Sequence, residues 1–404
     1  MYERDPSRVV VTGPLAPYAA DLCAAMLHQG YTPISTSELM QFTAHLSRWM
    51  EARGLEPMAL TEPVTTEFLD ERRLHYQKRR TPHALVPLLG HLRAVGAAPE
   101  APVPVDESEM GVLLAEYRKY LRDERGVAEV SVRRYLPPIR AFLATVPAPL
   151  EQGLAALTAE HVTRFVMEGA ARRSTADAKS MVTGLRSLLR FLFVTGHISR
   201  PLAEAVPTVA NRKLAALPGR LSAGQAATLL SGCDRTTPAG RRDFAILTLL
   251  ARLGLRACEA AAVEISDVDW RSGELAVRGK GGLTDRLPLP VDVGEALADY
   301  LLHSRPRDCS ATRLFLTEHA PRRPIDASGI RALVARGCKR AGLPRFAAHR
   351  LRHTVASDLL AAGAPLPEIG QVLRHRAQLS TTIYAKVDRV RLRELARPWP
   401  GETA

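Results

Sequence analysis

Two proline-rich segments most constrain how this chain can fold, because proline fixes its own backbone angle φ and cannot donate a backbone hydrogen bond. The first is "AAPEAPVPVDESE", from Ala97 to Glu109, and the second is "AVPTVANRKLAALPGR", from Ala205 to Arg220. Segments of this composition are typical of extended spacers between domains. The sequence therefore predicts domains at 1–106, 107–204 and 221–404, with a basic linker at 205–220.

The first two parts of the chain carry similar features in the same order. Each has a long amphipathic segment, "GYTPISTSELMQFTAHLSRWM" or "GVAEVSVRRYLPPIRAFL", then a Leu-Thr helix start, "LTEPVTTEFLDERR" or "LTAEHVTRFVMEGAARR". Each closes on a Leu-Leu helix that ends in glycine, at Gly96 and Gly196. Threonine favours helix N-caps and glycine favours helix C-termini. Shared composition could produce this likeness, but the matched order favours two helical-bundle units, the first a degenerate repeat of the second.

The third part combines helical and strand patterns. Ser222 and Gln225 stand at the positions of a capping box, and "RRDFAILTLLARLG" predicts a buried helix that stops at Gly254. Apolar and polar residues alternate on both sides of Gly281 and Gly282, which predicts a β-hairpin. The predicted fold class is thus mainly α, with a small β-sheet or hairpin in a mixed α+β C-terminal domain. Further helices are expected at 293–303, 327–341 and 347–362, followed by a short helix around Tyr384 and the tail helix "RVRLRELAR".

Charge and cysteine content narrow the choice of partner and compartment. The net charge is +13 and the isoelectric point about 9.9, which suits a nucleic-acid partner but also a merely solvated basic surface. The five cysteines are scattered without metal-ligand spacing, so no zinc site is expected. No apolar run reaches membrane-spanning length, and the N-terminus has no signal-peptide pattern. A cytoplasmic, nucleoid-associated protein is predicted.

Several basic groups could carry chemistry, although each has a plain structural alternative. Arg256, just after the buried helix, could simply pair with Glu259 one turn on. Lys280 stands at the predicted hairpin tip, where exposed lysines are common. His349 and Arg352 are three residues apart on one predicted helix face, a pattern that also arises by chance.

The segment "LRHRAQLSTTIYAKVD", from Leu373 to Asp388, adds His375 and Tyr384. A tyrosine on a short helix beside apolar residues is usually part of a core or its rim. The motifs of a phosphate loop, a His-Glu-x-x-His zinc helix and a Gly-x-Ser-x-Gly elbow are not present in the sequence.

Taken in order, "LGLRACE", "GKGGLTDRLPLP", "HRLRHT" and "LRHRAQLSTTIY" resemble the tyrosine recombinase, or phage integrase, family. The resemblance covers residues from about 109 to 388 and implies a SAM-like helical core-binding unit, a linker and a catalytic domain. All six signature positions are filled: Arg256, Lys280, His349, Arg352, His375 and Tyr384. The N-terminal third lies outside this common core.

The resemblance implies a cut-and-rejoin reaction on double-stranded DNA. Tyr384 would attack the phosphodiester, and Arg256 and Arg352 would stabilise its charge with planar, bidentate donors. Lys280 would protonate the departing 5′ oxygen. His349 would assist removal of the Tyr384 proton and contact the phosphate, and His375 would hydrogen-bond a phosphate oxygen. A 3′-phosphotyrosyl link stores the bond energy, so no cofactor is needed.

Two positions depart from the commonest pattern of the family. Arg350 stands where many members carry Asp, and Arg374 where many carry Gly. Both are interpreted as added positive charge beside the site, which affects target preference and leaves the chemistry unchanged.

The resemblance also suggests where DNA and other protomers would bind. Members act as tetramers on two DNA sites, and the equivalent DNA-facing helices carry Arg133, Arg134, Lys179 and Arg186. The first unit could touch flanking DNA or a neighbouring protomer. Its candidate basic residues are Arg48, Arg72, Arg73, Lys78, Arg79 and Arg80.

The favoured interpretation is a site-specific recombinase that integrates or excises a mobile element. A type IB topoisomerase shares the chemistry, but the extra bundle favours recombination. A DNA-binding protein with a dead site is disfavoured because all six positions are filled. A basic helical scaffold would leave the ordered motifs unexplained.

Overall fold

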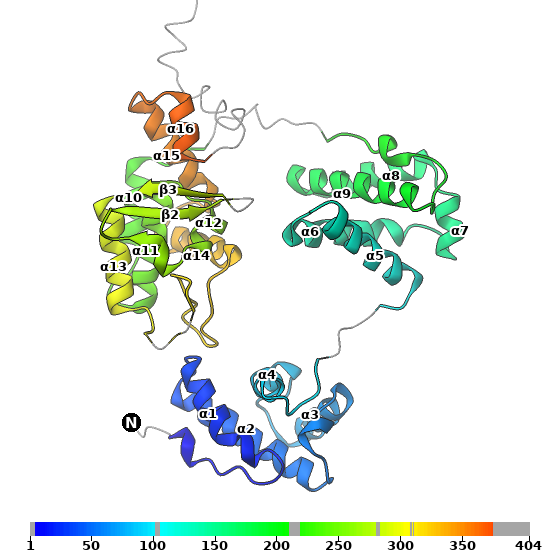
Figure 1. Cartoon of the computed structure of the whole chain (residues 1–404), viewed down its shortest axis with the longest axis vertical. Coiled ribbons are helices and arrows are strands. Elements are labelled where there is room, and N and C mark those ends of the chain that lie inside the picture. The colour runs from blue at the N-terminus through cyan, green and yellow to red at the C-terminus, as the bar shows by residue number, and fades with distance from the viewer. Residues whose placement is uncertain are drawn as a thin grey trace, which may run out of the picture. The chain divides into compact units, whose positions relative to one another are not determined.

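The structure is a computed structural model of the 404-residue chain, and it describes residues 5–101, 106–209, 219–279, 283–307, 309 and 311–374. Backbone contacts divide the chain into two compact units, one comprising 1–100 with 216–404 and the other 101–215 (Figure 1). The described residues build three large hydrophobic cores, at 15–98, 113–206 and 221–351, and a smaller one at 355–373.

Residues 1–100 form a helical bundle around Phe42, Trp49 and Phe68. The bundle contains α1 (Ala19–His28), α2 (Pro33–Glu51), α3 (Glu62–His75) and α4 (Val86–Ala94), with the short 3₁₀ turns η1 (Pro6–Arg8), η2 (Ala16–Tyr18), η3 (Pro57–Ala59) and η4 (Pro82–Leu85). Helix α2 begins at Thr32, whose hydroxyl accepts from Ser35 N at 3.1 Å. The glycine predicted to close the bundle, Gly96, has a φ of 71° and lies just after α4.

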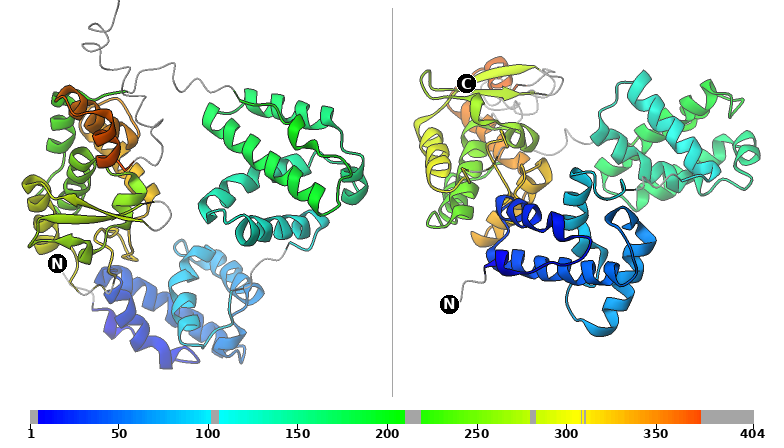
Figure 2. Two further views of the ribbon diagram at one scale, coloured as in Figure 1. Left: turned by 45° about the horizontal axis from the view of Figure 1, so that its top comes forward. Right: turned by 60° about the horizontal axis from the view of Figure 1, so that its bottom comes forward.

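Residues 101–215 form a second bundle, whose core includes Tyr117 and Phe142 (Figure 2). Its elements are α5 (Glu109–Lys119), the π-helical turn η5 (Tyr120–Glu124), α6 (Glu129–Leu143), α7 (Leu150–Ala155), α8 (Ala159–Ala171), α9 (Thr175–Val194) and the 3₁₀ turn η6 (Leu202–Ala205). Thr158 caps α8 as predicted, with its hydroxyl accepting from His161 N at 3.3 Å. The corresponding Thr61 starts α3 without such a side-chain bond.

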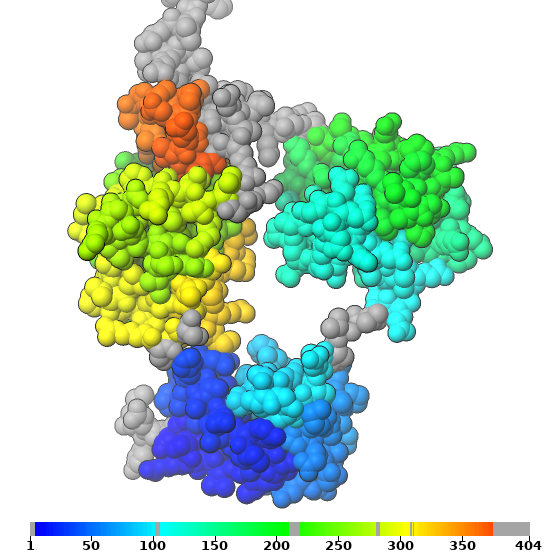
Figure 3. Space-filling view, viewed as in Figure 1, coloured from blue at the N-terminus to red at the C-terminus, as the bar shows by residue number. Residues whose placement is uncertain are grey.

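Residues 219–374 contain a small sheet among helices (Figure 1). The elements are α10 (Ala223–Ser231), α11 (Pro238–Leu253), α12 (Ala257–Ala262), η8 (Ile265–Asp267), β1 (Val268–Asp269), β2 (Glu274–Arg278), β3 (Thr284–Pro288), α13 (Val291–His303), α14 (Ala327–Arg340), α15 (His349–Ala361) and α16 (Leu366–Val372). The described strands form one antiparallel sheet in the order β1-β2-β3, with Leu275 opposite Leu287. In the space-filling view α15 and α16, in orange, lie directly against the yellow-green surface of this region (Figure 3).

Helix α11 is the central element of this region because its long apolar run is buried among α10, α13, α14 and α15. It ends at Gly254, whose φ of 59° is left-handed and therefore suits glycine. The capping box of α10 is present, since Ser222 and Gln225 exchange the two predicted bonds. Leu221 N donates to the Thr354 hydroxyl at 3.0 Å and so fixes the start of this region on α15.

The fold class predicted from the sequence is confirmed: helices dominate, and the hairpin is formed by β2 and β3. The three predicted helices near 293, 327 and 347 lie within two residues of their expected starts. The duplication of the bundle and the limits of the domains remain predictions. The helices expected around Tyr384 and in the tail lie outside the described residues. No helix in the described ranges is both long and apolar enough to cross a membrane.

Candidate active site

Among the predicted catalytic residues that the structure describes, Arg352 is the most deeply buried. It lies on the first turn of α15 with an exposed fraction of 0%. Its Nη1 donates to Gly254 O at 2.7 Å, and its Nη2 donates to Leu373 O. The guanidinium thus ties the end of α11 to the end of α16, and a fork with fixed geometry can hold both carbonyls at once.

Arg256 stands at the N-terminus of α12, two residues after the left-handed Gly254. Its Nη1 pairs with Glu259 Oε1, while its backbone N donates to Glu259 Oε2 at 2.8 Å. The side chain of Arg256 is 37% exposed, whereas that of Glu259 is 3% exposed. The Arg256–Glu259 pair that the sequence suggested as the structural alternative is therefore formed. The Arg256 side chain nevertheless still faces solvent.

The Glu259 carboxylate is the common partner of the arginines in this site. Arg374 Nη2 donates to its Oε2 at 2.8 Å, and Arg352 Nη1 lies 3.8 Å from the same oxygen. Burial alone raises the pKa of Glu259, but the bonds from the Arg256 backbone and the Arg374 guanidinium outweigh burial and hold this pKa below its ordinary value. One ionised carboxylate therefore binds or faces three guanidinium groups.

Sequence reasoning named Glu259 only as a partner of Arg256 and did not anticipate this role. The signal was present in "RACE", where an acid stands at the third helical position and can bond back to the helix start. Arg374 places its positive charge directly against Glu259, because its side chain is 5% exposed and its guanidinium is turned onto that carboxylate. An effect of Arg374 on target preference stays a prediction. Arg350 lies over the Phe346 ring, with its Nη2 3.5 Å from Arg220 O.

His349 is exposed at the first position of α15, although it shares that helix with the fully buried Arg352. Its ring packs edge-on against His353, with centroids 4.3 Å apart. Burial, and then the positive charge of Arg352, lower the pKa of His353. His353 therefore takes up a proton less readily than a free histidine.

Lys280, His375 and Tyr384 lie outside the described residues, so their placement stays a prediction. The hairpin that carries Lys280 is described on both sides of its tip, and Gly279 N donates to Leu283 O at 2.8 Å. Arg278 anchors the hairpin with two bonds of 2.8 Å to the Asp267 carboxylate.

The predicted DNA contacts in the second bundle differ in exposure. Arg133 on α6 has a side chain that is 78% exposed and lies 3.3 Å from Glu129, whereas Arg134 bonds Asp177 at 3.1 Å. Lys179 and Arg186 on α9 are half-buried, and Arg186 Nη2 donates to Val206 O at 2.8 Å. Arg186 thereby holds the end of the second bundle's core at Val206, a role that leaves fewer of its donors for a phosphate.

One candidate in the first unit must be corrected. Arg72 was counted among the basic residues that could face DNA, but it is 8% exposed. Its guanidinium lies over the rings of Phe42 and Tyr76, at 4.9 and 4.2 Å from their centroids. Its Nε donates to Arg79 O at 3.1 Å, so Arg72 belongs to the core of the bundle.

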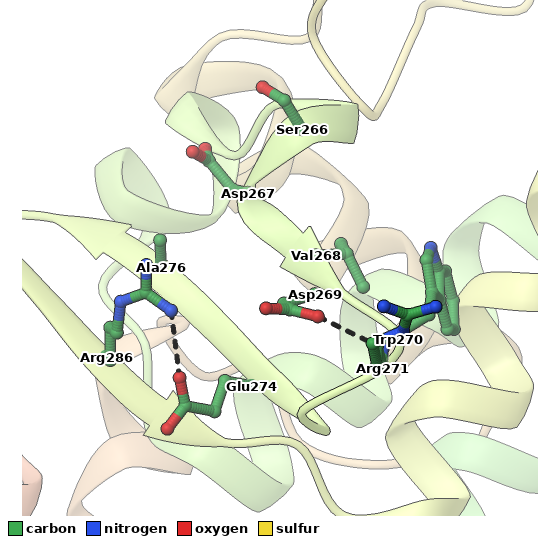
Figure 4. Close-up of a pocket in the computed structure, with 9 residues that line it drawn as sticks. All are labelled: Ser266, Asp267, Val268, Asp269, Trp270, Arg271, Glu274, Ala276 and Arg286. Carbon is green, nitrogen blue, oxygen red and sulfur yellow. Dashed lines mark hydrogen bonds and ion pairs between the residues drawn. The ribbon is translucent and has the colours of Figure 1, made fainter.

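A pocket beside β1 and β2 is separate from this cluster (Figure 4). Several of its charged lining residues already have partners: Arg286 bonds Glu274 at 3.0 Å, and Asp269 accepts from Arg271 N at 3.0 Å. Its lining includes none of the predicted catalytic residues. The arginine cluster around Glu259 is therefore the better candidate for the active site.

Comparisons with known proteins identify the family of the chain. The sequence profile of the phage integrase family matches residues 219–391, and that of the phage integrase N-terminal SAM-like domain matches 114–196. A protein of Sinorhizobium fredii named "Putative integrase/recombinase y4rA" is 40% identical over 96% of both chains. Tyrosine recombinase XerC of Corynebacterium efficiens is 32% identical over 72% of this chain and 92% of its own.

Solved structures show the same fold. XerH recombinase bound to a palindromic difH substrate matches with a TM-score of 0.56, at 17% identity, over 83% of this chain and 94% of its own. Residues 75–356 of lambda integrase, in a dimer bound to a COC′ core site, match with a TM-score of 0.53, at 19% identity, over 72% of this chain and 98% of that one.

Fold and sequence together define the class as tyrosine recombinases, enzymes that cut and rejoin DNA strands. The chain belongs to the phage integrase family.

Proposed function

We propose that this recombinase cuts a specific DNA site through a 3′-phosphotyrosyl intermediate on Tyr384 and serves the integration or excision of a mobile element. The observation that carries the proposal is the convergence of Arg256 and Arg352, far apart in sequence, on one buried carboxylate. Arg352 and Arg256 also contact the carbonyls of residues 373 and 374, directly before the segment with His375 and Tyr384.

The cleavage step divides among these residues as follows. The phenolic oxygen of Tyr384 attacks the phosphorus while the bond to the 5′ oxygen breaks. His349 accepts the phenolic proton, and Lys280 donates a proton to the departing oxygen. Arg256 and Arg352 offset the charge that gathers on the non-bridging oxygens, and His375 donates to one of them. Attack by a 5′-hydroxyl reverses the step and rejoins the strands.

Several chains would assemble on the DNA. Arg133, Arg134, Lys179 and Arg186 are proposed to contact phosphates, and four protomers would act on two sites. Each phosphate contact makes the slope of log affinity against log salt concentration more negative by about 0.9, so several contacts give a steep loss of affinity with salt. The tail after Asp388, with Val390, Leu392 and Leu395, is a candidate for protomer contact.

The test is to trap covalent complexes on genomic DNA fragments from the host, digest the protein and sequence the attached ends. Wild-type protein should yield ends that cluster at one sequence and carry a 3′ adduct. Tyr384→Phe removes the hydroxyl alone and should yield no adduct, with Tyr135→Phe in the second bundle as a matched control that still does. Adducts from Tyr384→Phe, or adducts at random positions on plasmid DNA, would contradict the proposal, and the latter would indicate a topoisomerase.

A further inference from the structure

Arg374 has an unusual backbone conformation. Its φ is 55°, in the left-handed region that residues with a Cβ adopt only at an energetic cost. Its guanidinium is nevertheless 5% exposed and bonded to Glu259 Oε2 at 2.8 Å. Strained backbone of this kind persists where the side chain has a role that the surroundings enforce.

The three arginines around Glu259 differ in their freedom to reach a substrate. Arg352 is fully buried and already donates to Gly254 O at 2.7 Å, and Arg374 is almost as buried. Arg256 has a side chain that is 37% exposed, so it is the arginine of the three with the most freedom to turn toward a phosphate arriving from solvent.

A movement of Arg256 has a consequence for Glu259. The Arg256 guanidinium holds Oε1, and when it turns to a phosphate this oxygen loses its partner. A buried carboxylate without a counter-charge is costly, and it would also repel the phosphate. Arg352 Nη1 lies 3.8 Å from Oε2, whereas Arg374 Nη2 lies at 2.8 Å. Arg374 is therefore the group placed to compensate Glu259.

We propose that Arg374 is a positioning residue that keeps the charge of Glu259 compensated while Arg256 engages the DNA phosphate. Arg374 acts on the reaction through Glu259 and Arg256 and does not itself touch the substrate. This inference rests on the proposed function, because it assumes that Arg256 binds the phosphate that is cut.

The experiment compares Arg374→Gly and Arg374→Lys with wild type on a nicked duplex carrying the site recovered by adduct sequencing. Glycine accepts the left-handed backbone, so the first variant removes the guanidinium without adding strain. Its single-turnover cleavage rate at saturating protein should fall about tenfold, as for loss of one charge-assisted hydrogen bond. Its Kd for the duplex should stay within about twofold of wild type. Lysine keeps the charge and should restore most of the rate.

The matched control is Arg79→Gly, which makes the same replacement at an arginine with a φ of 54° in the first bundle. Because Arg79 is already held near Glu38, at 3.5 Å, and lies outside the catalytic region, this variant should leave the single-turnover cleavage rate at saturating protein unchanged. Adding Arg374→Gly to a Glu259→Gln protein should lower the cleavage rate by less than about twofold, because the glutamine amide carries no charge that Arg374 would need to compensate. Wild-type rates for Arg374→Gly, or an equal loss in both backgrounds, would overturn the inference. A wild-type protein that forms no Tyr384-dependent adduct would instead overturn the proposed function.

Discussion

The catalytic region and the first helical bundle each bury an arginine that holds a turn in place. Arg352 donates to Leu373 O, directly before the left-handed Arg374, and Arg72 donates to the carbonyl of the left-handed Arg79. Their other partners differ. Arg352 faces the Glu259 carboxylate, whereas Arg72 lies on two aromatic rings and contacts His45.

This difference separates a structural arginine from one suited to catalysis. The Arg72 guanidinium is bound within the bundle by two aromatic faces and a backbone carbonyl. It is therefore not placed to bind an anion that arrives from solvent. The catalytic cluster gathers three guanidinium groups around one carboxylate, so positive charge exceeds what Glu259 can neutralise. A buried arginine indicates an anion site when it belongs to such a surplus.

The largest effect is expected from Arg352→Lys. A single ammonium cannot hold the carbonyls of both Gly254 and Leu373 and also present a fork to a phosphate. We expect single-turnover cleavage to fall at least about a hundredfold, which is the scale of losing a preorganised donor. Arg72→Lys is the matched change in the first bundle and should leave the cleavage rate of folded protein unaltered. Equal losses in both variants would remove the distinction between the two arginines.

The next effect is on stability. Arg72→Met keeps a long apolar side chain but removes the donor to Arg79 O and the cation over the Phe42 and Tyr76 rings. We expect the first bundle to lose about 1–3 kcal/mol of unfolding free energy, the usual cost of an unpaired buried acceptor. Fluorescence of the buried Trp49 during chemical unfolding of the full chain measures this loss, with Trp270 and Trp399 changed to Phe so that Trp49 alone contributes the signal. Unchanged unfolding would mean that the Arg72 contacts contribute no net stability.

The two regions also show what sequence can and cannot reveal. The glycine at 254, the capping box at Ser222 and the hairpin around Gly281 follow local rules, and the structure confirms each within the described residues. The convergence on Glu259 joins α12, α15 and Arg374, the second residue after α16, and such contacts depend on tertiary packing. Arg72 was misjudged for the same reason, because a basic run does not reveal which member turns inward.

A smaller effect concerns pH. Burial, with the positive charges of Arg72 and Arg48, lowers the pKa of His45 in the first bundle. The folded state thus takes up a proton less readily than the unfolded chain, so stability rises with pH through this window. The stability linked to His45 should be fully present above about pH 6.5, the ordinary pKa of histidine. It should be lost as the pH falls from there through the lowered pKa of His45 in the folded state. The Trp49 unfolding transition should show this slope, and His45→Gln should flatten it. An identical slope in the variant would assign it to other groups.

The smallest effect is expected from removing the first bundle, and its size follows from charge. Residues 1–100 carry ten Lys and Arg against eleven Asp and Glu, whereas residues 101–215 carry sixteen against twelve. Of the basic candidates in the first bundle, Arg72 is buried, Arg73 pairs with Asp70 and Arg79 lies 3.5 Å from Glu38. A balanced surface of this kind gives little general attraction to phosphates.

Of these candidates, Arg48, Lys78 and Arg80 remain for DNA. Lys78 also lies 3.6 Å from Glu38, but its side chain is 84% exposed, against 26% for Arg79. A protein that starts at Val105 should still form the Tyr384 adduct, and its log–log salt slope should be shallower by at most about 2.7, or 0.9 for each of about three phosphates. Its footprint should lose a few flanking base pairs. Arg48, Lys78 and Arg80 changed together to Gln in the full chain should reproduce that slope. Equal slopes and footprints for the long and short proteins would exclude DNA contact by the first bundle. Sedimentation of the two on DNA would then show whether the bundle instead joins protomers, because the short protein would assemble less cooperatively.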